Sequence, residues 1–89
     1  MTAYLISFDL NNPGQNYDDI DNAIKAYGTW CKIVTTTYVI VSEKSAKEIR
    51  DDLQKHIDSN DKLFVLKSGV EAAWTGFKQS TTDWLKKHL

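Results

Sequence analysis

The chain has 89 residues, of which 42% are hydrophobic and 26% are charged, a composition typical of one small globular domain. Eleven basic and twelve acidic residues give a net charge of −1, and Arg50 is the only arginine. A nucleic-acid-binding domain usually carries a basic stripe, so this charge balance does not support a nucleic-acid partner. No segment approaches the ~20 apolar residues that a membrane span needs, which argues against a membrane protein.

The chain has one cysteine, Cys31, which therefore has no internal disulfide partner. Its position in an apolar run indicates a structural thiol rather than a reactive one. The first apolar run is short and follows no Lys or Arg, so we expect no signal peptide. Together these features predict a cytoplasmic protein.

The first predicted element is a strand over Ala3–Asp9, where large apolar residues alternate with smaller or polar ones. Its bulky side chains point to one side, where we expect helices to cover them: Tyr4, Ile6 and Phe8. The opposite side ends with Asp9, directly before a loop that contains Pro13 and Gly14. We expect that opposite side to lie on a helix-free face of the sheet.

A helix is predicted over Tyr17–Tyr27, since apolar residues recur there at helical spacing. Asn16 is the expected N-cap, and Gly28 is the expected stop signal. Three acidic residues occupy the first turns, where the helix dipole favours negative charge. We interpret them as a solvated helix start: Asp18, Asp19 and Asp21.

The next β-rich stretch is too long for one strand, and we divide it into Trp30–Val34 and Thr37–Ser42. A second helix is expected over Ser45–Ile57, because Ser45 and Glu48 have the spacing of a capping box. Alternation then predicts a fourth strand over Lys62–Ser68. The order in residues 1–69 is β-α-β-β-α-β, which predicts a ferredoxin-like α+β fold with an antiparallel four-stranded sheet and both helices on one face.

Residues 70–89 form a C-terminal extension of this single domain, with a helix start expected near Ser80–Asp83. We expect the extension to pack on the sheet edge or on a partner chain. The other sheet face has no helix to cover it in this prediction. Its expected apolar residues are Leu5, Ile33 or Val34, Val39 or Ile40, and Val65 or Phe64. Such a face predicts a homodimer that buries the face or its edge.

Asp9 is the main candidate site residue, as catalytic residue and as metal ligand, since a carboxylate at a strand end is held firmly yet remains accessible. In a dimer formed through the helix-free face, two Asp9 carboxylates would approach one another and could hold Mg²⁺ or Mn²⁺. The alternative is a purely structural role, in which Asp9 only begins a turn. No Ser, Cys or His constellation indicates covalent catalysis, and His56 is interpreted as a surface or helix-end residue.

Several motifs carry a resemblance to known families. The segments Phe8-Asp9-Leu10 and Tyr27-Gly28, with the strand at 35–41, resemble the second core CRISPR-associated protein of spacer acquisition and its relatives, the virulence-associated protein D toxins. Within that superfamily, a family of short bacterial and phage proteins labelled SinR-like is more similar. That similarity involves the segments at 9–17, 45–50 and 57–63, and Trp84-Leu85-Lys86.

The resemblance implies two functions for this chain. In the wider superfamily the strand-end aspartate is implicated in metal-dependent phosphodiester cleavage, which maps onto Asp9. The arginine-rich surface of the DNA-holding members has no counterpart here, since Arg50 stands alone. The preferred hypothesis is therefore a non-catalytic dimeric interaction module. The alternative is a defence- or toxin-type nuclease, an endoribonuclease or DNase, that uses Asp9 with Mg²⁺ or Mn²⁺.

Overall fold

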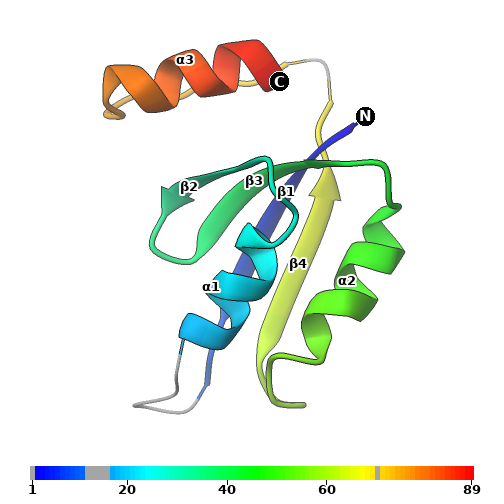
Figure 1. The fold of residues 1–89 in the computed structure, drawn as a ribbon. Coiled ribbons are helices and arrows are strands. Elements are labelled where there is room, and N and C mark those ends of the chain that lie inside the picture. Colours follow the sequence, from blue (N-terminus) through cyan, green and yellow to red (C-terminus); the bar gives the residue numbers. More distant parts are fainter. Residues whose placement is uncertain (1, 12–16, 70) are drawn as a thin grey trace.

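The computed structural model describes residues 2–11, 17–69 and 71–89 (Figure 1). The order of elements along the chain is β1 (Thr2–Asp9), α1 (Asp18–Lys25), β2 (Trp30–Val34), β3 (Thr37–Ser42), α2 (Ala46–Gln54), β4 (Lys62–Lys67) and α3 (Gln79–His88). The two middle strands have the predicted bounds. The first strand begins one residue earlier than predicted, at Thr2, and the fourth ends one residue earlier, at Lys67.

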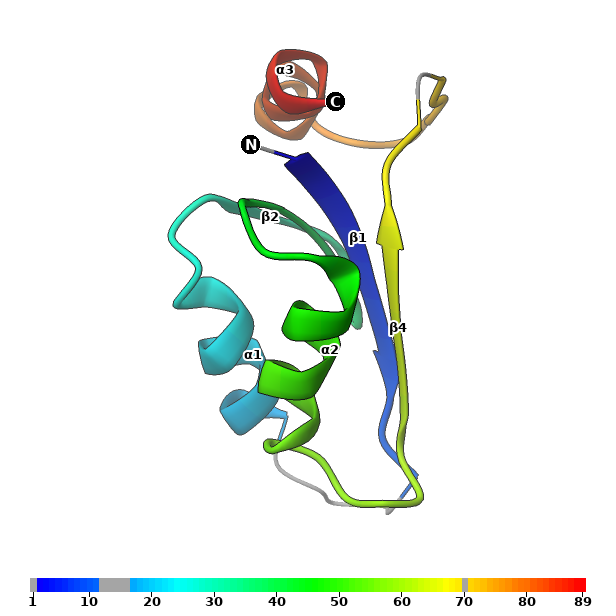
Figure 2. The same ribbon diagram turned by 90° about the vertical axis from the view of Figure 1, so that its right-hand side faces the viewer.

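The four strands form one sheet in the order β2-β3-β1-β4, and all neighbouring strands are antiparallel. Helices α1 and α2 lie together on one face of this sheet, as Figure 2 shows. Each helix connects two strands that are separated in the sheet by a third one, the arrangement of a split β-α-β unit. The predicted ferredoxin-like α+β fold is therefore confirmed.

The main core lies between the sheet and these two helices. The alternation in β1 directs Tyr4, Ile6 and Phe8 toward the helices, as the sequence predicted. They meet buried residues of the helices and of β3, namely Ile20, Ile24, Tyr38, Ile40, Ile49 and Leu53. Full burial of each such side chain is worth about 1.5–3 kcal/mol, so this layer provides most of the stabilisation.

Helix α1 is shorter than the predicted span Tyr17–Tyr27. Beyond its last residue the chain tightens, because the N–H of Gly28 donates to the carbonyl of Lys25 at 3.0 Å. Gly28 then adopts a φ of +92°, a conformation that glycine takes without a Cβ clash. The expected cap, Asn16, lies outside the described residues. Tyr17 is the residue that precedes the helix, and its side chain makes no capping hydrogen bond.

Helix α2 begins with the predicted capping box. The Oγ of Ser45 accepts a hydrogen bond from the Glu48 N–H at 3.2 Å, and the Oε1 of Glu48 accepts one from the Ser45 N–H at 3.0 Å. The helix ends at Gln54 rather than at the predicted Ile57, since the Ile57 N–H reaches back three residues to the Gln54 carbonyl at 3.4 Å. That closing turn is too tight to continue an α-helix.

The expectation that no helix covers the second sheet face was wrong in part. Helix α3 lies at the end of the sheet where β1 begins and β4 ends (Figures 1 and 2). Its residue Leu85 is buried against Ala3 and Val39, which belong to the face opposite to α1 and α2. The helix begins at Gln79, one residue before the predicted Ser80. Further half-buried residues of this second cluster are Leu5, Ile33, Val41, Trp74, Phe77 and Trp84.

Candidate functional site

The face of the sheet opposite to α1 and α2, here called the open face, is only partly covered. Leu5 lies at its centre, between Val39 of β3 and Leu66 of β4 in the strand register. A groove of about 440 Å³ runs between this centre and the C-terminal extension, where Trp74 and Leu85 form part of its wall. The lining is mainly apolar, so water in this groove has few hydrogen-bonding partners.

Two large apolar side chains of β4 are about half exposed to solvent beside this groove. Phe64 is 52% exposed and Leu66 is 51% exposed, and both point to the open face. The alternate residues Leu63 and Val65 pack against the main core instead. The strand therefore presents an apolar surface on both of its sides, although α1 and α2 close only one of them. Phe64 was one of the residues that the sequence assigned to this face as alternatives.

The two edge strands of the sheet differ. In β2 the register with β3 shifts between Lys32 and Val34. An irregularity of this kind disfavours pairing of an edge strand with another chain. In β4 the register with β1 is regular from Lys62 to Lys67, and among the described residues no strand pairs with its outer edge. The β4 edge therefore lacks the protection that the β2 edge has.

Asp9 lies at the end of β1 and is exposed, opposite Lys62 of β4 in the strand register. Around it is a shallow depression of about 160 Å³, to which Ser7 and Phe64 also contribute. In the described part of the chain, no three His, Cys, Asp or Glu side chains are grouped so that they could hold a metal ion. A metal site at Asp9 would need ligands from a second copy, and it stays a prediction.

An aspartate that the sequence analysis did not single out lies near this end of β1. The Oδ1 of Asp61 accepts a hydrogen bond from the Asn11 N–H at 2.8 Å, and its Oδ2 accepts one from the Asp58 N–H at 2.7 Å. Asp61 thus joins the segment after β1 to the turn before β4. The signal in the sequence was an aspartate in a turn, a position where its side chain often binds nearby backbone N–H groups.

The acidic start of α1 is more than a solvated turn. Asp19 lies 3.0 Å from the Nδ1 of His56, and Asp21 accepts a hydrogen bond from the Tyr38 hydroxyl at 3.0 Å. Burial, together with this bond to a carboxylate, raises the pKa of Tyr38 to about 12. His56 lies at the surface, as expected, and it pairs the turn after α2 with α1. Two of the three helix aspartates therefore connect α1 to neighbouring elements.

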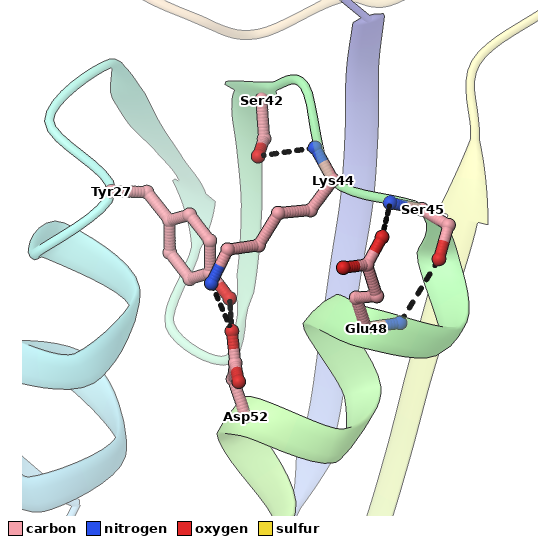
Figure 3. A network of polar contacts seen from close by, with 6 residues as sticks. All are labelled: Tyr27, Ser42, Lys44, Ser45, Glu48 and Asp52. Atoms are coloured by element: carbon pink, nitrogen blue, oxygen red, sulfur yellow. Dashed lines mark hydrogen bonds and ion pairs between the residues drawn. The ribbon is translucent and has the colours of Figure 1, made fainter.

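A second polar network joins the turn after α1 to α2, and Figure 3 shows its residues. Asp52 accepts hydrogen bonds from the Tyr27 hydroxyl at 3.0 Å and from the Nζ of Lys44 at 2.6 Å. The hydrogen bonds from Lys44 and Tyr27 hold the pKa of Asp52 below its usual range. Burial and the same carboxylate raise the pKa of Tyr27. Both pKa shifts oppose proton transfer at neutral pH, so Tyr27 and Asp52 do not resemble an acid–base pair. The hydrogen bonds of the network give it a structural role.

Cys31 is half-buried, next to the C-terminal extension. Burial raises the pKa of its thiol, and a hydrogen bond with Thr81 and the charge of Lys78 only partly oppose this effect. The thiolate is the reactive form of cysteine, so this environment disfavours a nucleophilic role. A structural thiol was the interpretation from the sequence.

Comparison with known proteins gives no family assignment. No protein-family model matches the chain, and none of the curated proteins is significantly similar to it. Within residues 2–11, 17–69 and 71–89, no helix has the length and apolar character that crossing a bilayer requires. Geometry is therefore the basis for the functional argument.

Proposed function

We propose that this chain is a non-catalytic interaction module that forms a homodimer through the β4 side of its open face. The observation that carries the proposal is the pair of half-exposed side chains, Phe64 and Leu66, beside an apolar groove. Contiguous apolar surface of this kind marks interaction sites in small soluble domains. The similarity to the CRISPR-associated and virulence-associated D superfamily then reflects a shared fold.

The position of α3 supports an interface on this part of the molecule. Leu85 closes the end of the open face near Ala3 and Val39, but the exposed residues of β4 lie outside that cluster. Burial in an interface would stabilise the dimer by roughly 25 cal/mol for each Å² of apolar surface removed from water. The driving force for association is therefore concentrated on β4.

The test compares apolar-to-acidic changes on the two edge strands. Leu66→Asp and Val34→Asp alter residues that are 51% and 54% exposed in the monomer, so their effects on the fold should be similar. Sedimentation equilibrium at micromolar concentration should give a dimer for the wild type and for Val34→Asp, and a monomer for Leu66→Asp. A monomeric wild type would refute the proposed function, and a Leu66→Asp dimer would place the interface elsewhere.

A metal-dependent nuclease is the second candidate, because Asp9 is exposed at a strand end on the same side of the sheet. It would need Mg²⁺ or Mn²⁺ and a nucleic-acid substrate. The net charge of −1 gives little attraction for a phosphate backbone, which makes this candidate the weaker one. Incubation of the protein with labelled RNA and DNA, with Mn²⁺ or with a chelator, tests it directly.

A further inference from the structure

The outer edge of β4 has a hydrogen-bonding pattern that follows from the strand register. The Ser68 N–H donates to the Ala3 carbonyl at 2.9 Å, which makes these two residues a hydrogen-bonded pair. Bonded and non-bonded pairs alternate in an antiparallel ladder, so Phe64 and Leu66 direct their backbone groups toward β1. Lys62 does the same, and the strand residues that direct their backbone groups outward are Leu63, Val65 and Lys67.

The opposite side of β1 has the matching pattern. The Phe8 N–H donates to the Thr36 carbonyl at 3.0 Å, so even-numbered residues of β1 bond toward β3. Odd-numbered residues of β1 are left to bond toward β4, which agrees with the Ala3–Ser68 pair. The outer edge of β4 therefore offers three successive N–H and C=O pairs to another strand.

We infer that the occupant of this edge is a second copy of the chain, paired antiparallel along β4 about a two-fold axis at Val65. The inference rests on the proposed self-association and specifies how it occurs. The centre of β4, Phe64-Val65-Leu66, is self-complementary about Val65, because reversing it places an apolar residue opposite an apolar residue at all three positions. A two-fold axis requires such a self-complementary strand, because each residue type must suit its own reversed copy.

The hydrogen-bonding pattern and the side-chain faces agree in this register. Val65 would pair with Val65 of the second copy, and Leu63 with Lys67 of the second copy, so all outward groups find partners. Phe64 would lie opposite Leu66 of the second copy, twice per dimer, with Cα atoms about 4.5 Å apart. The exposed apolar residues of both copies would then cover one another on the open face. Leu66 also lines the apolar groove, so Phe64 of the second copy would reach its mouth.

Charge complementarity favours a second copy over an unrelated strand. Asp61 lies one residue before β4, and Lys67 is the last residue of the strand. In the antiparallel pair, Lys67 lies diagonal to Asp61 of the second copy, a separation of about 7–8 Å between backbones that a lysine side chain can span. A register shifted by two residues, with Phe64 on the axis, would place Asp61 directly opposite Lys67, but it would leave the half-exposed Leu66 opposite Lys62 and without an apolar partner.

This geometry also bears on Asp9. The two β1 strands would be separated by three inter-strand spacings, roughly 14 Å, and the two Asp9 residues would be displaced further along the strands. A shared metal ion needs oxygen ligands at about 2–2.6 Å, so the two carboxylates of this dimer would not share one. Edge pairing and an Asp9 metal site on the two-fold axis are therefore mutually exclusive.

Disulfide trapping tests the register without altering the apolar residues. In a Cys31→Ala background, Lys62→Cys and Ser68→Cys are prepared as separate proteins, mixed, and oxidised with a glutathione buffer. Lys62 lies opposite Ser68 of the second copy in the inferred register, within the Cα separation of a disulfide. In either variant alone, the two equivalent cysteines would be roughly 20 Å apart. Covalent heterodimer in the mixture, with at least tenfold less dimer from each protein alone, is the expected result.

A charge reversal provides a second readout that does not depend on disulfide geometry. Lys67→Glu should weaken the dimer about tenfold or more, while Lys32→Glu on the opposite edge strand should leave it unchanged. Both lysines are exposed strand residues on the helix side of the sheet.

The possible results distinguish the proposed dimer from the specific claim that it pairs along β4. A wild-type dimer that gives no Lys62→Cys/Ser68→Cys heterodimer, or that tolerates Lys67→Glu, would refute pairing along β4 and leave the proposed function intact. A monomeric wild type would refute both, and would leave the edge to an extended segment of another protein.

Discussion

The two faces of the sheet are built from the same four strands but are completed in different ways. Among the described residues, ten buried ones, from Tyr4 to Leu53, form the core between the sheet and α1 and α2. In the same part of the chain, the cluster on the open face has three buried hydrophobic residues, Ala3, Val39 and Leu85, and Phe64 and Leu66 stay half exposed. The first face accounts for folding. The second has apolar surface in excess of what its own chain covers, which points to association.

The largest expected effect comes from truncation on the helix-covered face. Ile6 is fully buried. Ile6→Ala should lower the free energy of unfolding by about 2–5 kcal/mol, because the truncation leaves a cavity in the core. Leu66→Ala should change the stability of the monomer far less, by about 0.5 kcal/mol, since about half of the side chain is already exposed to solvent. Urea unfolding at low protein concentration measures both. Equal costs for the two variants would contradict the distinction between the faces.

The helix-covered face could be predicted from the sequence because the patterns that specify it are local. The alternation of Tyr4, Ile6 and Phe8 indicated which side of β1 is covered, and the spacing of Ser45 and Glu48 marked the start of α2. These patterns follow directly from strand and helix periodicity. The ferredoxin-like fold was then predicted from the succession of these elements along the chain.

The covering of the open face and the polar network around Asp52 could not be predicted in the same way. The extension was expected to pack on the sheet edge or on a partner chain, but no periodicity in its sequence tells which surface receives it. The Tyr27–Asp52 contact joins residues 25 positions apart, one in the turn after α1 and the other in α2. Contacts of this kind depend on how elements are placed in three dimensions, so a single sequence contains no local signal for them.

The next effect concerns the part of the open face that α3 closes. Leu85→Ala should lower the free energy of unfolding by about 2 kcal/mol, because the residue is 3% exposed in a smaller cluster than the main core. Leu89→Ala is the matched control, since that leucine is 42% exposed and should cost little. Thermal unfolding of the two variants measures the difference. A neutral Leu85→Ala would show that α3 does not stabilise the sheet.

A smaller, pH-dependent effect is expected on the outer surface of the helix layer. The pKa of Asp52 is lowered in the folded state, so its contribution is present at neutral pH and is lost as the pH falls below about 4. Asp52→Asn should therefore make the melting temperature less sensitive to acid than it is in the wild type. The effect should be modest, because the Asp52 and Lys44 side chains are 39% and 49% exposed. Melting curves between neutral pH and about pH 2 provide the test; parallel acid profiles would contradict the assigned role.

The smallest expected effect is at Asp9. A ligand that binds only the folded state raises its stability, so a metal site would appear as a higher melting temperature with Mn²⁺. We expect no Mn²⁺-dependent shift in the wild type, and a neutral or slightly stabilising effect of Asp9→Asn. Activity on labelled RNA or DNA is measured alongside. A Mn²⁺-dependent stabilisation that disappears in Asp9→Asn would favour the nuclease and contradict the interaction module.

Amide hydrogen exchange along β4 tests the central claim, self-association through this strand, most directly. Phe64 and Leu66 bond toward β1, so their amides should be protected at every protein concentration. The amides of Leu63, Val65 and Lys67 point outward. They should be protected at high concentration and should exchange rapidly on dilution. Rapid exchange of these three amides at a concentration where the protein sediments as a dimer would contradict pairing along β4.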